Sequence, residues 1–105
     1  MDRTRAIDAL AAALADAGAR AEWSKLGAAA RELGPRIQAL AAAGRWSAAE
    51  RAALARLRDA HERARVQADA ASAQLQARLD EMAGNKEGWM AYALAGEPDT
   101  EQNNA

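Results

Sequence analysis

The most regular pattern of apolar and polar positions lies between Ser47 and Met82. This stretch of about 36 residues contains no glycine or proline and would form a helix of roughly 54 Å at about 1.5 Å per residue. Ser47 and Glu50 have the Ser-x-x-Glu spacing of a capping box, which predicts that the helix begins there. One stripe then steps along it by three and four residues: Leu54, Leu57, His61, Ala64, Ala68, Ala71, Leu75, Leu79 and Met82. Such a long helix needs other segments to pack against its stripe.

Two shorter helical patterns precede the long one. Residues 4–17 carry apolar side chains at helical spacing, with Asp2 or Thr4 as candidate cap and Gly18 as the expected stop. Residues 22–43 form the second pattern, which Gly34-Pro35 interrupts. The stripe keeps its phase across the proline, which favours a kinked helix; the alternative is a break with Pro35 starting a new helix. The two stripes are Ile7, Leu10 and Leu14, then Trp23, Leu26, Ala30, Leu33, Ile37 and Leu40.

The chain after Met82 changes character. Gly84-Asn85 is predicted to end the long helix, and residues 86–95 are predicted to form a short C-terminal helix that folds back onto it. This segment is dense in apolar side chains, with Trp89, Met90, Tyr92 and Leu94. Residues 97–105 are polar and predicted to be a disordered tail.

Composition supports an all-α fold. The chain is rich in alanine, the best helix former, and has no phenylalanine and few β-branched aliphatic residues from which strands are built. We therefore predict a small antiparallel helical bundle forming a single domain over residues 1–96. Alanine burial contributes little per residue, so the core is thin and a dimer or another partner would add stability.

Several functional classes are disfavoured by what the chain lacks. There is no cysteine, and the net charge is only −1, so disulfides, thiolate chemistry and a global field for nucleic acid are not expected. No apolar run approaches the roughly 18 residues of a membrane span. Asp8 and Asp16 interrupt the first apolar run, which argues against a secretory leader. The expected location is the cytoplasm.

Catalysis is not predicted either. His61 is the only histidine, and its sequence neighbours Asp59 and Glu62 point elsewhere on the helix, so it is interpreted as a packing or partly exposed side chain. No cofactor or metal site is expected. Arg51, Arg58 and Arg65 share one helical face. This face is interpreted as a contact for nucleic acid, as a contact for a protein partner, or simply as a face exposed to solvent. The acidic residues between them favour the solvated face.

The aromatic segment near Trp89 and Tyr92 permits two interpretations. It is either a permanent plug over the end of the bundle or a detachable lid, because a short helix that contains Gly88 can open at modest cost. If it opens, Leu75, Leu79 and Met82 form an apolar groove that suits an amphipathic helix. The predicted partner-binding site consists of Leu75, Leu79, Met82, Trp89 and Tyr92.

Three segments resemble the FliT-type flagellar export chaperones, a family of small all-helical cytoplasmic proteins. They are Gly18 followed by residues 22–26 (Glu-Trp-Ser-Lys-Leu), residues 75–82 (Leu-Gln-Ala-Arg-Leu-Asp-Glu-Met), and Ala91-Tyr92. The order and lengths of four helices are also similar, so the resemblance covers about residues 7–94.

The resemblance implies that the chain binds the C-terminal region of the filament-cap protein before type III export. It also implies contacts with the export ATPase assembly and, in some members, the flagellar transcription activator. Leu75, Leu79 and Met82 would line the binding surface, and Trp89 and Tyr92 in the last helix would gate it. The alternative is a structural coiled coil or adaptor that self-associates, with a homodimer interface at Ala64, Ala68 and Ala71.

Overall fold

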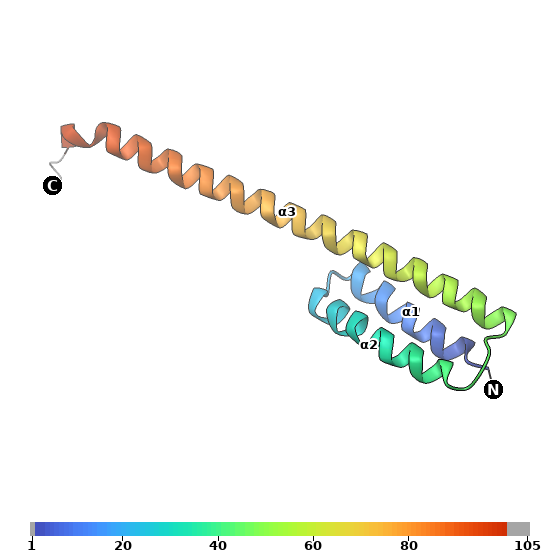
Figure 1. Cartoon of the computed structure of the whole chain (residues 1–105). Helices are drawn as coiled ribbons and strands as arrows, with labels where there is room; N and C mark the ends of the chain where they lie inside the picture. The colour runs from blue at the N-terminus through green and yellow to red at the C-terminus, as the bar shows by residue number, and fades with distance from the viewer. Residues whose placement is uncertain (1, 101–105) are drawn as a thin grey trace. The chain divides into compact units, whose positions relative to one another are not determined.

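The computed structural model describes the backbone of residues 2–100 and the side chains of residues 2–95. Its helices are α1 (Thr4–Ala19), α2 (Trp23–Ala41) and α3 (Ala48–Thr100) (Figure 1). Helices, turns and short links account for all of the backbone described, so the prediction of an all-α chain is confirmed. The chain divides into two compact units, Met1–Ala70 and Ala71–Ala105.

The first unit is a small antiparallel bundle of α1, α2 and the beginning of α3 (Figure 1). Its core takes side chains from all three helices: Ile7, Leu14 and Ala17, then Leu26, then Ala53, Leu57 and Ala64. Ile7 and Leu14 are completely buried, and burying a side chain of this size contributes about 1.5–3 kcal/mol. The other core members are three alanines and two leucines, so Ile7, Leu14 and the two leucines, Leu26 and Leu57, supply most of the buried apolar surface.

The turn after α1 is not where the sequence predicted it. Gly18 does not stop the helix but lies buried inside it, and the backbone reverses at Ala21, whose φ is 57°. A Cβ added at Gly18 would lie 3.7 Å from the Cα of Ala64 and would collide with the side chain of Gln67. The Gln67 amide ends a flexible side chain that can move aside, and 3.7 Å is ordinary van der Waals contact, so a single methyl would fit here, but a larger side chain would press on α3.

Replacing Gly18 by leucine is expected to lower the free energy of unfolding by about 1–3 kcal/mol, because the added side chain forces α1 away from Ala64. Urea denaturation measures this change. Gly84→Leu is the matched control, since a Cβ there meets nothing within 4 Å and removing a helical glycine gains up to about 1 kcal/mol. Similar losses in both variants would show that close packing at Gly18 is not the cause.

The predicted capping box at the start of α3 is confirmed. The backbone N–H of Glu50 donates to Ser47 Oγ at 3.1 Å, and the backbone N–H of Ser47 donates to Glu50 Oε1 at 2.8 Å. Arg51 Nη1 also donates to the carbonyl of Trp46 at 2.9 Å, as the residues before the helix close over its first turn. The two capping-box bonds satisfy backbone amides that have no partner within the helix.

Glu50 has a second role that the sequence pattern did not reveal. Its carboxylate accepts hydrogen bonds from the backbone and the guanidinium of Arg3, at 2.8 to 3.1 Å. Arg3 also donates to the carbonyls of Leu40, Gly44 and Arg45, and its guanidinium carbon lies 4.1 Å from the centroid of the Trp46 ring. The buried Arg3 thus ties the residues before α1 to the end of α2 and the start of α3.

The hydrogen bond from Arg3, followed by that from Ser47, lowers the pKa of Glu50 from 4.5 to about 2. A carboxyl with a depressed pKa stabilises the folded state fully above pH 4.5, and this contribution is lost as the pH falls towards 2. We therefore expect the urea midpoint to fall across this window. In Glu50→Gln the midpoint should be lower at neutral pH and its dependence on pH flatter. An unchanged slope in Glu50→Gln would contradict the assignment.

Helix α2 is continuous through Pro35, so the alternative of a break into two helices is wrong. Its observed range of Trp23–Ala41 is followed by a link in which Gly44 has a φ of 116°. That conformation favours glycine and reverses the chain before Trp46. Leu33 and Ile37, on either side of the proline, both pack partly buried against the core.

The second unit corrects the main structural prediction. Gly84-Asn85 does not end the long helix, and no separate short helix forms at residues 86–95, because α3 runs without interruption over Ala48–Thr100 (Figure 1). A glycine typically ends a helix by adopting a positive φ. Within the described backbone, only Ala21 and Gly44 have a positive φ, so neither Gly84 nor Gly88 has the conformation that would end α3. At Gly84 and Gly88 the glycines remain helical at a cost of about 1 kcal/mol each relative to alanine. Residues 97–100, predicted to belong to a disordered tail, are described as the end of α3, and the rest of that tail, residues 101–105, lies outside the described residues.

Candidate partner-binding surface

The second unit presents its large apolar side chains to solvent. Every side chain that the structure describes from Ser72 to Ala95 is exposed. Leu79 is the least exposed of the predicted site residues at 48 %, while Trp89 and Tyr92 are 72 % and 75 % exposed. Soluble chains rarely leave so many large apolar groups uncovered on one short segment without a binding role.

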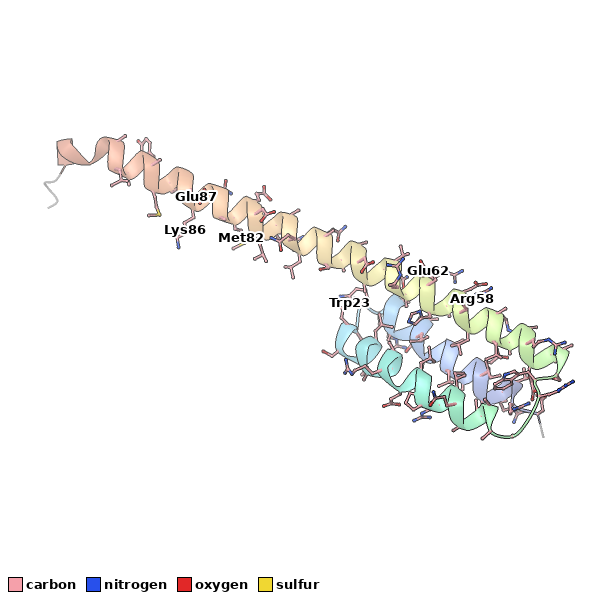
Figure 2. The ribbon with its side chains drawn as sticks, viewed as in Figure 1. Trp23, Arg58, Glu62, Met82, Lys86 and Glu87 are labelled. Atoms are coloured by element: carbon pink, nitrogen blue, oxygen red, sulfur yellow. The ribbon has the colours of Figure 1, made fainter. Side chains whose placement is uncertain are left out.

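Four of these side chains lie on one face of α3. Leu75, Leu79, Met82 and Trp89 occupy steps of four, three and seven residues, with Lys86 filling the gap in the last step. This is the a/d spacing of a coiled-coil seam, and it extends roughly 21 Å along the helix at 1.5 Å per residue. Figure 2 shows Met82 and Lys86 projecting from the same side of α3. We call these five residues the seam.

Tyr92 lies beside the seam rather than on it. Its ring meets the Trp89 ring edge to face, with centroids 6.4 Å apart and planes at 88°. Together with Gly84, Asn85 and Gly88, the two aromatic side chains border a shallow hollow of about 480 Å³. A Cβ placed at either glycine would meet no atom within 4 Å, so the flank of the Trp89 ring is open to an apolar side chain.

The predicted lid is therefore wrong. Trp89 and Tyr92 belong to the same continuous helix as Leu75, Leu79 and Met82, and they do not cover them. All five predicted residues are accessible, four of them on one face, and their role in partner binding stays a prediction. The helical period showed correctly which residues share a face but not whether anything covers that face.

His61 lies in the first unit and is exposed. It borders a hollow of about 240 Å³ that is lined by Trp23, Leu26, Ala64, Ala68 and a few neighbours. The lining holds no carboxylate or hydroxyl group that would orient the imidazole as a base. Across the described residues, no three His, Cys, Asp or Glu side chains gather as metal ligands would.

The arginine face of α3 is partly neutralised by its neighbours. Arg65 pairs with Glu62 and with Asp69, both at 2.7 Å, and the hydrogen bond from Arg65 lowers the pKa of Glu62. Exposed pairs of this kind contribute little stability, but they leave fewer free cations for a phosphate backbone. Arg51, Arg58 and Arg65 are all exposed, and whether their face contacts a partner or only solvent stays a prediction.

A second apolar surface escaped the sequence patterns. A groove of about 670 Å³ runs between α1 and α2 in the first unit, lined mainly by alanine and leucine. Ala6, Ala9 and Ala13 on α1 face Ala29 and Ala39 on α2 across it. The helical spacing of these alanines was the available signal, but in such an alanine-rich chain it does not stand out.

Helices in the described residues are not both long and apolar enough to cross a membrane. Comparisons with protein-family models, curated protein sequences and solved structures found no match.

Proposed function

We propose that the chain is a protein-binding chaperone rather than an enzyme, and that the seam is its client-binding surface. The observation that carries the proposal is the exposure of Leu75, Leu79, Met82 and Trp89 along one helical face. A client helix with its own apolar stripe would bury these side chains, and burial contributes about 25 cal/mol for each Å² of apolar surface removed from water.

The proposed client is the C-terminal region of the filament-cap protein, held in the cytoplasm before type III export. Two of the segments that resemble the FliT-type chaperones, residues 75–82 and Ala91-Tyr92, lie in the second unit. The export ATPase assembly and the flagellar transcription activator are further proposed partners on the same resemblance. In this proposal no lid opens; the residues around Trp89 form part of the surface itself.

Self-association is the second candidate, because a seam at a/d spacing is also what a coiled coil uses. The homodimer interface predicted from the sequence, at Ala64, Ala68 and Ala71, cannot form with all three residues, because Ala64 is buried in the core of the first unit. A self-associating chain would have to pair through the seam instead. Sedimentation equilibrium decides this point, since seam pairing predicts a dimer that is lost in Leu79→Asp.

Isothermal titration of the full chain with a purified C-terminal fragment of filament-cap protein tests the client. We expect saturable 1:1 binding and a gain in helical circular dichroism as the fragment folds against the seam. Absence of binding, with the chain folded and monomeric, would contradict this client.

A further inference from the structure

The seam is not uniformly apolar. Lys86 occupies the position between Met82 and Trp89 where the spacing calls for a core side chain. A helix that covers the seam must therefore either place a compensating group opposite the ammonium or leave the charge to reach solvent along its flexible stem.

The other charges of this segment make the face more cationic. Arg78 flanks the seam on one side, within about 60° of its centre at 100° per residue. Asp80, Glu81 and Glu87 fall more than about 100° from the centre, on the opposite side of the helix. Asp80 there accepts a hydrogen bond from Gln76 at 2.9 Å. Among residues 72–95, whose side chains the structure describes, no carboxylate thus lies on the face that a partner helix would cover.

A second copy of the chain fits this face poorly. Parallel pairing in register would set Lys86 against Lys86, and antiparallel pairing would set it against an apolar member of the seam such as Leu75 or Met82. Neither arrangement supplies a carboxylate, and an unpaired cation in a covered seam disfavours the complex.

Resting on the proposed client-binding role, we infer that the partner is a helix whose apolar stripe carries a carboxylate opposite Lys86. Leucine-type side chains of the partner would pack on Leu79, Met82 and Trp89, and the carboxylate would accept hydrogen bonds from the ammonium. Such a charged seam position fixes the register of the two helices and excludes partners with a cation there.

Synthetic three-heptad peptides test the inference. Each has leucine at five of its six seam positions, and the sixth, next to the middle of the peptide, is Glu, Gln or Lys, so that it can lie near Lys86 in either orientation. Titrated into the full chain, the Glu peptide should bind at least about tenfold more tightly than the Lys peptide, with Gln between them. Lys86→Glu should reverse the order. Lys25→Glu, the same change at an exposed site on α2, should leave it unaltered.

The outcomes separate the inference from the proposed function beneath it. Equal binding of the three peptides, still abolished by Leu79→Asp, overturns the acidic-partner inference and leaves the client-binding seam standing. An order that survives Lys86→Glu likewise overturns the inference, because the preference then comes from net charge. Failure of all three peptides to bind contradicts the seam as a helix-binding surface.

Discussion

Replacing Arg3 by alanine is expected to lower the free energy of unfolding of the first unit by about 3 kcal/mol. The change removes the guanidinium that binds the Glu50 carboxylate and the carbonyls of Leu40 and Gly44. It also removes the cation stacked on Trp46. These groups stay in the folded state without their partner, which is the costly way to break a buried ion pair. Urea denaturation followed by circular dichroism measures the loss.

Arg56→Ala is the matched control for this prediction. Arg56 also forms an ion pair across the bundle, with Asp8 at 3.1 Å, but both side chains are about half exposed. Exposed pairs contribute at most about 1 kcal/mol, so the control should unfold close to the wild type. Arg3→Lys keeps the charge but loses the planar fork of donors and should fall between the two. Equal small losses at Arg3 and Arg56 would show that the buried pair does not hold the bundle together.

Replacing Leu79 by aspartate is expected to weaken client binding at least 30-fold, about 2 kcal/mol or more. Leu79 lies in the seam between the apolar side chains of Leu75 and Met82, and a carboxylate there would have to lose its water when the client helix covers it. Because the side chain is half exposed and lies in the second unit, the core of the first unit is unaffected. Isothermal titration with the filament-cap fragment measures the effect.

Ala77→Asp is the matched control for Leu79→Asp. It adds the same charge to the same helix two residues away, but on the side opposite the seam. Binding should change less than about threefold. Comparable weakening by both substitutions would mean that helix propensity or net charge is responsible, and that the client does not bind the seam.

Local patterns in the sequence predicted the beginning of α3 well. The Ser47–Glu50 spacing encodes a capping box that needs only four consecutive residues to form. The helical stripe likewise predicted that Leu57 and Ala64 face the core, because period alone determines which residues share a face.

Long-range features could not be predicted in this way. Arg3 and Glu50 are 47 residues apart, and near the N-terminus Arg3 looks like any other surface charge. Gly84-Asn85 carried a stop signal, yet glycine is compatible with helical φ and ψ. The signal acts only where the following chain gains by turning back, as it does at Gly44. This is why Leu75, Leu79 and Met82 were identified as one apolar face but were wrongly expected to be covered by the segment around Trp89.

Amide hydrogen exchange of the full chain, with and without the filament-cap fragment, tests the client-binding seam most directly. Helix amides exchange through local opening, so a helix bound along Leu75–Trp89 should slow exchange across that part of α3. The account predicts this protection, with little change in α1 and α2. Binding that instead protects the groove between α1 and α2, and leaves Leu75–Trp89 unchanged, would contradict it.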